Sequence, residues 1–135
     1  DIVGYTKRCT GMSPKEIADW MSQVHADVEQ LLSKHFIRKI ETRGDCYVCV
    51  SGTNTVDGDR DQNQMSRMVA FALDVAVALH TNHDTQIRVG IDIGPLTITY
   101  IDSNHYAPTV CAFGDPMVVA GKLEQCGSPS MIRLS

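Results

Sequence analysis

The sequence has no excess of positive charge, no long apolar run and no recurring cysteine pairs. Its 12 Lys and Arg residues against 16 Asp and Glu give a net charge of −4, so a nucleic-acid groove, which needs clustered cations, is not expected. No stretch approaches the roughly 18 to 20 apolar residues of a membrane-spanning helix, and the first residues lack the basic start of a signal peptide. We therefore expect no nucleic-acid partner and no membrane contact from this segment.

The five cysteines are odd in number, and their spacing does not repeat as it would in a zinc ribbon. This pattern favours free thiols in a cytoplasmic setting. Cys46 and Cys49 match a CxxC pattern, but they lie in a β-rich run, where residues three apart point to opposite faces. We expect both to be small buried hydrophobic residues and not redox or metal ligands.

One hydrophobic core and one domain, residues 1–135, are expected from a chain of 135 residues of which 43% are hydrophobic. Ser13, Pro14 and Glu16 have the pattern of a capping box with proline in the first turn, which predicts a helix from Pro14 to about Lys34. A second helical period runs from 63 to 80. It is apolar nearly all round, which predicts a largely buried helix.

Short β-rich runs fill most of the remaining sequence. Two of them flank Thr42–Asp45, which is therefore predicted to form a hairpin tip, and 51–61 and 102–107 are predicted loops. Helices that alternate with such hairpins indicate an α+β fold of the ferredoxin-like sandwich kind. The predicted strands are 36–40, 46–51, 86–93, 96–101, 109–113 and 131–134, with a short helix at 116–125.

Two acidic residues, Asp1 and Asp45, stand at the ends of apolar β-like runs and are separated by one helix-length segment. Two carboxylates in such positions suit hard divalent cations, which prefer oxygen ligands. The small residues beside them leave backbone N–H groups free for phosphate. The pairing predicts a two-metal triphosphate site, although Asp1 alone is better explained as a chain-start acid and Asp45 alone as a turn residue.

Four motifs, in order along the chain, resemble those of the class III nucleotidyl cyclases, which make cyclic AMP or cyclic GMP. The motifs are Asp1-Ile2-Val3-Gly4-Tyr5-Thr6, Lys39-Ile40-Glu41-Thr42-Arg43-Gly44-Asp45, Arg88-Val89-Gly90-Ile91-Asp92-Ile93-Gly94-Pro95 and Pro108-Thr109-Val110-Cys111-Ala112-Phe113-Gly114-Asp115. The resemblance covers nearly the whole chain and implies the ferredoxin-like sandwich of the cyclase catalytic domain. It also implies a fragment that is truncated at both ends.

The resemblance implies two ions, Mg2+ or Mn2+, held by the carboxylates of Asp1 and Asp45 and the carbonyl of Ile2. It further implies that the backbone N–H groups of Gly4, Tyr5 and Thr6 bind the phosphates near a helix start. In the family's reaction a ribose 3′-hydroxyl attacks the α-phosphate of its own nucleotide, and pyrophosphate leaves.

Two further positions concern the choice of base. By resemblance, Glu41 and Cys111 occupy the positions at which guanylate cyclases have Glu and Cys. Adenylate cyclases usually carry Lys and Asp there. A carboxylate suits the donor edge of guanine, so GTP is the preferred substrate, with an adenylyl-type cyclase that uses ATP as an alternative. Taken separately, Glu41 also fits an exposed strand-end acid, and Cys111 a core thiol.

Two residues depart from the family pattern. Val118 stands at the position of an Asn that orients the ribose, and Lys122 stands at the position of a transition-state Arg but lacks the planar fork. Class III domains work as head-to-tail dimers, so a heterodimer whose partner supplies Asn and Arg is preferred over a homodimer. The run Gly121–Cys126 also resembles the metal-donating α subunit of soluble guanylate cyclases.

In that heterodimer Glu41 and Cys111 would line a second, vestigial site, and the choice of base would rest largely with the partner. The alternative is a catalytically degenerate pseudo-cyclase that regulates a partner. Arg43 replaces an apolar residue close to Asp45, where it could pair with a phosphate or repel cations. Thr97–Ile101 replaces a small-residue run that the family packs near its dimer interface, which leaves the dimer geometry open.

Overall fold

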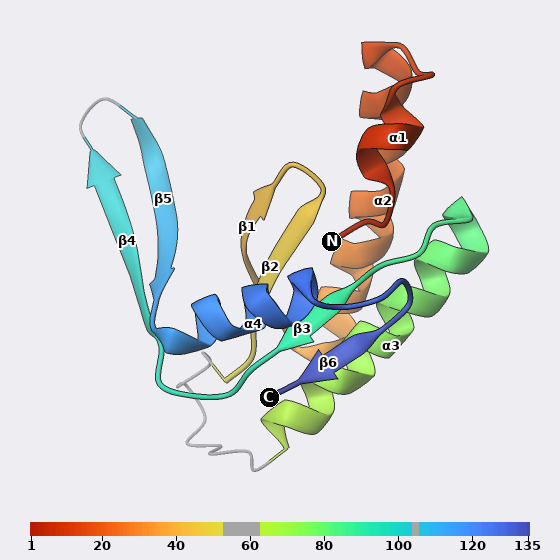
Figure 1. Ribbon diagram of the computed structural model, residues 1–135. Coiled ribbons are helices and arrows are strands. Elements are labelled where there is room, and N and C mark those ends of the chain that lie inside the picture. Colours follow the sequence, from red (N-terminus) through yellow and green to blue (C-terminus); the bar gives the residue numbers. More distant parts are fainter. Residues whose placement is uncertain (53–62, 104–105) are drawn as a thin grey trace.

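The computed structural model describes residues 1–52, 63–103 and 106–135. Helices and strands are mixed along the chain, which confirms the predicted α+β class (Figure 1). Most of the predicted loop 51–61 lies outside the described residues. The elements are α1 (Tyr5–Cys9), α2 (Pro14–His35), β1 (Arg38–Arg43), β2 (Cys46–Val50), α3 (Gln64–His83), β3 (Val89–Ile91), β4 (Thr97–Ser103), β5 (Tyr106–Phe113), α4 (Asp115–Gln125) and β6 (Ile132–Leu134).

Helix α2 begins with the capping box that the sequence predicts. The Glu16 N–H donates to Ser13 Oγ at 3.3 Å, and the Ser13 N–H donates to Glu16 Oε2 at 2.7 Å. The helix ends where Phe36 adopts a left-handed conformation, with φ of 54°. The predicted bounds are therefore confirmed to within a residue or two. Its buried face consists of Trp20, Val24, Val28 and Leu32.

Helix α3 is less buried than its apolar sequence predicts. Leu73 and Val77 are 53% and 65% exposed, so the expectation of a largely buried helix is wrong. In the described part of the chain α3 packs on α2, β3 and β6, which together cover only one of its faces. The buried residues are Phe71, Ala72, Val75 and Leu79.

The strands pair two by two. The pairs β1–β2 and β4–β5 are antiparallel hairpins, and β3 and β6 are parallel. Residues 102–107, predicted as a loop, partly continue the last hairpin, because Asp102 and Ser103 belong to β4 and Ala107 to β5. An antiparallel hairpin with a solvated face accepts polar side chains. The strand predicted at 86–93 is shortened to Val89–Ile91.

The core lies where α2 and α3 meet the chain start and the segment before β3, while the β4–β5 hairpin extends away from this body (Figure 1). None of the helices in the described ranges has the length and apolar character needed to span a bilayer. The core residues are Ile2, Trp20, Val24, Val28, Leu32, Ile37, Phe71, Val75, Leu79 and Ile87.

Candidate functional site

Asp1 is fixed by the pairing of the chain start with the segment that precedes β3. Ile2 is 5% exposed and forms an antiparallel bridge with Ile87. Two backbone hydrogen bonds flank this bridge: the Val3 N–H donates to the Gln86 carbonyl, and the Arg88 N–H donates to the Asp1 carbonyl, both at 2.9 Å. The carbonyl of Ile2 takes no part in these bonds. The buried Ile2 side chain therefore anchors Asp1 in place.

The Asp1 carboxylate contacts a cation that the sequence analysis left without a role. Arg88 Nη2 lies 2.5 Å from Asp1 Oδ2 and 2.9 Å from Glu124 Oε1, although the second contact lacks hydrogen-bond geometry. All three side chains are partly buried: Asp1 is 19% exposed, Arg88 31% and Glu124 15%. The position of Arg88 at the head of the third motif is the signal that could have identified it.

Asp45 follows Gly44, whose positive φ of 62° makes the tight turn between β1 and β2. The pKa of Tyr5 is raised by its hydrogen bond with Cys9, by burial, and by the negative charges of Cys9 and Asp45. Tyr5, Tyr47 and Cys49 all pack against the core that contains Ile2, so the β1–β2 hairpin that carries Asp45 lies beside the segment that carries Asp1 (Figure 1).

The predicted metal ligands match hard cations in chemical type. Among residues 1–52, 63–103 and 106–135, no three His, Cys, Asp or Glu side chains form a complete metal cage. The carboxylates of Asp1 and Asp45 and the carbonyl of Ile2 are oxygen donors, which Mg2+ and Mn2+ prefer, and so small a set leaves positions for phosphate oxygens and water. These residues fit cations that bind together with a nucleotide.

Gly4, Tyr5 and Thr6 form the start of α1, next in the chain to Asp1 and Ile2. Gly4 is the N-cap, with φ of 71°, and its carbonyl accepts the Arg8 N–H at 2.9 Å. The first N–H groups of a helix have no acceptor within the helix. The segment therefore offers backbone donors near the predicted metal ligands.

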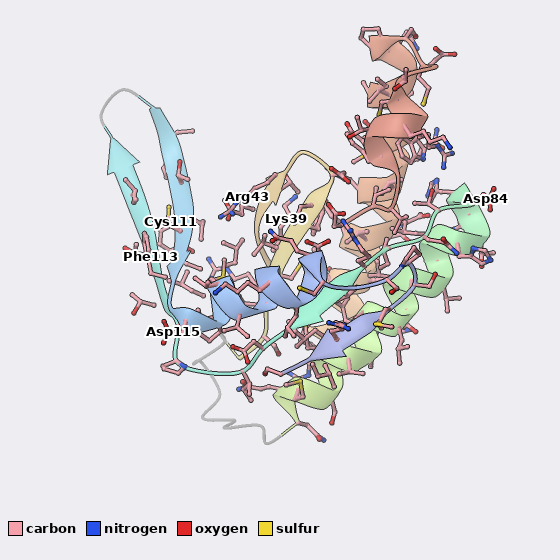
Figure 2. The ribbon with its side chains drawn as sticks, in the orientation of Figure 1. Lys39, Arg43, Asp84, Cys111, Phe113 and Asp115 are labelled. Carbon is pink, nitrogen blue, oxygen red and sulfur yellow. The ribbon has the colours of Figure 1, made fainter. Side chains whose placement is uncertain are left out.

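The two predicted base-reading residues come from different hairpins. Glu41 lies on β1, and Cys111 lies on β5, where it pairs with Thr99 of β4. Strands β1 and β5 contact each other, and Figure 2 shows Arg43 on the side of β1 that is nearer to Cys111. Arg43 Nη2 lies 2.5 Å from Glu41 Oε1. The structure therefore gives Glu41 a partner that the sequence analysis did not predict.

Helix α4 carries Val118 and Lys122 one turn apart on its exposed side, and Val118 is 56% exposed. The opposite side of the helix packs very closely on β3. A Cβ atom on Gly90 would lie 2.0 Å from the Ala120 carbonyl oxygen, so only glycine fits at this contact. The tight packing fixes α4 against β3, and Val118 and Lys122 remain exposed to solvent.

Known proteins resemble this chain over its whole length. The family described as "Adenylate and Guanylate cyclase catalytic domain" matches residues 1–135. The chain is 31% identical over 139 residues to guanylyl cyclase C of Cavia porcellus, and 30% identical over 141 residues to the human guanylate cyclase soluble subunit beta-2. These matches cover 100% of the chain but only 13% and 22% of the relatives.

Solved structures of cyclase domains also superpose on this chain. The guanylate cyclase domain of RhGC from Catenaria anguillulae, in complex with GTP, superposes with a TM-score of 0.88 at 25% identity, covering 100% of this chain and 74% of that one. The guanylyl cyclase Cya2 superposes equally well, with a TM-score of 0.88 at 19% identity, over 71% of its length. The second likeness concerns the fold alone.

Proposed function

The chain belongs to the adenylate and guanylate cyclase catalytic domain family, and we propose that it acts as the metal-donating half of a heterodimer that converts GTP to cyclic GMP and pyrophosphate. One observation carries this proposal. The segments that carry Asp1 and Asp45 pack against the same core beside α1, whereas the outward side of α4 carries Val118 and Lys122 in place of the ribose and transition-state residues.

In this proposal Asp1, Asp45 and the Ile2 carbonyl hold two divalent ions, Mg2+ or Mn2+. When bound, such ions lower the pKa of the attacking hydroxyl and neutralise charge on the phosphates. Ile2 belongs to the buried hydrophobic core, and this packing fixes the position of the neighbouring Asp1 backbone. Arg88 places a positive charge beside Asp1, and the N–H groups of Gly4, Tyr5 and Thr6 bind phosphate oxygens.

The reaction requires alignment more than covalent chemistry from the protein. The 3′-oxygen of the ribose forms a bond with the α-phosphorus, and the bond from that phosphorus to the bridging oxygen breaks. The electron pair leaves with pyrophosphate, and the hydroxyl proton passes to solvent or to a phosphate. The residues of this chain hold the phosphates and their counter-charges in place during this exchange.

The other half of a working site has to come from a partner. Val118 cannot hydrogen-bond to the ribose, and Lys122 supplies a charge without the paired donors of arginine. The loss of one preorganised donor typically lowers the rate by about 10²–10³, so a homodimer that lacks both is expected to be nearly inactive. A partner domain with Asn and Arg on its own α4 restores these contacts.

Guanine is the proposed base because Glu41 and Cys111 match the guanylate cyclase pattern, and because a similar domain is solved in complex with GTP. In the heterodimer the base is read mainly by the partner. The pseudo-cyclase alternative is favoured by the same α4 substitutions and predicts regulation of a partner without turnover. A cytoplasmic setting for the domain stays a prediction.

A complementation assay tests the proposal. The partner is a guanylate cyclase domain whose own two metal aspartates are replaced by asparagine, so that it is inactive by itself. We expect cyclic GMP to form from GTP and Mn2+ only when this chain is added, with little cyclic AMP from ATP. If the two domains co-purify but the mixture stays inactive, the metal-donating role is wrong and the pseudo-cyclase alternative is supported.

A further inference from the structure

Glu41, one of the two predicted base-reading residues, is already paired within its own strand. Arg43 Nη2 lies 2.5 Å from Glu41 Oε1, and the two side chains are 69% and 35% exposed. Both the hydrogen bond with Glu41 and its negative charge raise the pKa of Arg43. The carboxylate that would face a base therefore faces a guanidinium group.

The local strand geometry explains why these two residues meet. Residues two apart in a strand point to the same face, so Glu41 and Arg43 are neighbours on one side of β1. The bulge between Lys39 and Glu41 shifts the register, so that Glu41 pairs with Val48 and Arg43 with Cys46. Strand β5, which carries Cys111, contacts β1, and Figure 2 shows Arg43 directed toward that hairpin.

A guanidinium group and the guanine base present the same kind of edge to a carboxylate. Guanine offers its N1–H and its 2-amino group as adjacent donors, and arginine offers adjacent N–H donors in a planar fork. We propose that Arg43 acts as an intramolecular substitute for guanine: it occupies the Glu41 carboxylate and thereby removes base selectivity from this chain's second half-site. Arg43 is in this sense a specificity-determining residue that lies outside the metal site.

This inference rests on the proposed function, because it assumes that Glu41 lines the base-binding half of a cyclase site. It adds that the half-site is degenerate in two independent ways. Val118 and Lys122 remove contacts to the ribose and the transition state, and Arg43 removes the reading of the base. The ion pair is partly exposed, so a guanine base can compete with it at a modest cost, of about fivefold in affinity.

Nucleotide binding, measured without turnover, tests the inference on the homodimer of the chain. The probes are fluorescently labelled GTP and ATP in the presence of Mn2+, titrated against the unchanged chain and Arg43→Thr. Threonine suits an exposed strand position, and thermal unfolding confirms that the variant is folded. Arg133→Thr, which removes the same charge from β6, is the matched control.

We expect the unchanged chain and Arg133→Thr to bind GTP and ATP with similar affinity. Arg43→Thr should bind GTP about fivefold more tightly, with ATP unchanged, and adding Glu41→Gln should abolish the gain. If Arg43→Thr binds GTP and ATP as the unchanged chain does, the inference is overturned while the proposed function stands. If no variant binds either nucleotide, the unchanged chain included, the inference is overturned, while the proposed function, which concerns the heterodimer, is decided by the complementation assay.

Discussion

The guanidinium of Arg88 lies between the carboxylates of Asp1 and Glu124, 2.5 Å from the first and 2.9 Å from the second. Asp1 belongs to the predicted metal site, and Glu124 belongs to α4, the helix with the substituted positions Val118 and Lys122. One side chain therefore connects the half of the site that the family pattern preserves to the helix where the pattern is lost.

Replacing Arg88 by methionine should lower the free energy of unfolding and increase the rise in Tm that Mn2+ causes. The change leaves Glu124, which is 15% exposed, without its cation, so we expect a loss of about 2 kcal/mol in unfolding free energy. Because Asp1 then has no competing ion pair, a given Mn2+ concentration should raise the Tm more than in the unchanged chain. Thermal unfolding with and without Mn2+ measures both effects.

Lys15→Met is the control, because its ion pair with Asp19 is 83% and 59% exposed and is worth little. This variant should keep the stability and the Mn2+ response of the unchanged chain. An equal Mn2+-induced rise in Tm for Arg88→Met and the unchanged chain would show that Arg88 does not compete for Asp1.

Gly90→Ala should destabilise the fold strongly. The new Cβ atom would lie 2.0 Å from the Ala120 carbonyl oxygen and 2.6 Å from the Glu124 nitrogen, so α4 has to shift, at a cost of about 3 kcal/mol or more. Gly121→Ala in the same helix meets nothing within 4 Å and should stabilise it by about 0.5–1 kcal/mol. Urea unfolding of both variants checks the opposite signs, and equal effects would contradict the close packing.

Cys49 should resist alkylation in the folded protein. Burial raises the pKa of this thiol to about 12, and only the thiolate reacts. At pH 8 we expect iodoacetamide to label the exposed Cys126 and to leave Cys49 unmodified until the chain is unfolded, as mass spectrometry can show. Labelling of Cys49 at the rate of the exposed Cys126 would contradict the raised pKa of the Cys49 thiol.

The same pKa shift has a consequence for stability at high pH. In the unfolded chain the Cys49 thiol ionises near its ordinary pKa of 9.0, whereas in the folded protein it stays neutral up to about 12. The unfolded state therefore binds fewer protons in this range, and stability falls as pH rises from about 9 to 12. Cys49→Ala should remove this part of the pH dependence.

Restoring the two α4 side chains should give the homodimer activity. Val118→Asn supplies a hydrogen-bonding amide at a position that is 56% exposed, and Lys122→Arg supplies the planar fork. Each change alone should have a small effect, and the double variant should raise cyclic GMP formation by about 10²-fold or more. A double variant that folds and dimerises but stays inactive would mean that Arg43 or the β4–β5 hairpin imposes the defect.

The sequence predicted well those features that depend on neighbouring residues. The capping box of Ser13 and Glu16 located the start of α2, and the turn at Gly44 located the hairpin that carries Asp45. It failed where contacts between distant segments decide the outcome. The apolar pattern around Val77 did not reveal which face α2 covers, and residues 102–107 looked like a loop because a hairpin exposed to solvent can be polar.

In the candidate site, too, the sequence predicted the local motifs but not the contacts between them. Motif spacing predicted Asp1, Ile2 and Asp45 as metal ligands, and their roles stay predictions, but the segments that carry them pack against the same core. The partners of these residues could not be predicted. Arg88 lies 87 positions from Asp1, and Arg43 was predicted to lie in the hairpin tip, whereas β1 continues through it and brings it to the same face as Glu41.

The central claim is that this chain supplies the metal ligands of a shared site, and the asymmetry of that arrangement can be measured directly. The measurement is cyclic GMP formation by the complementing mixture, with Asp45→Asn placed in this chain and dimerisation verified by sedimentation. We predict that this variant abolishes the activity of the mixture, whereas Glu41→Gln in the same chain lowers it less than twofold. Full activity of the mixture with Asp45→Asn in this chain would contradict the account.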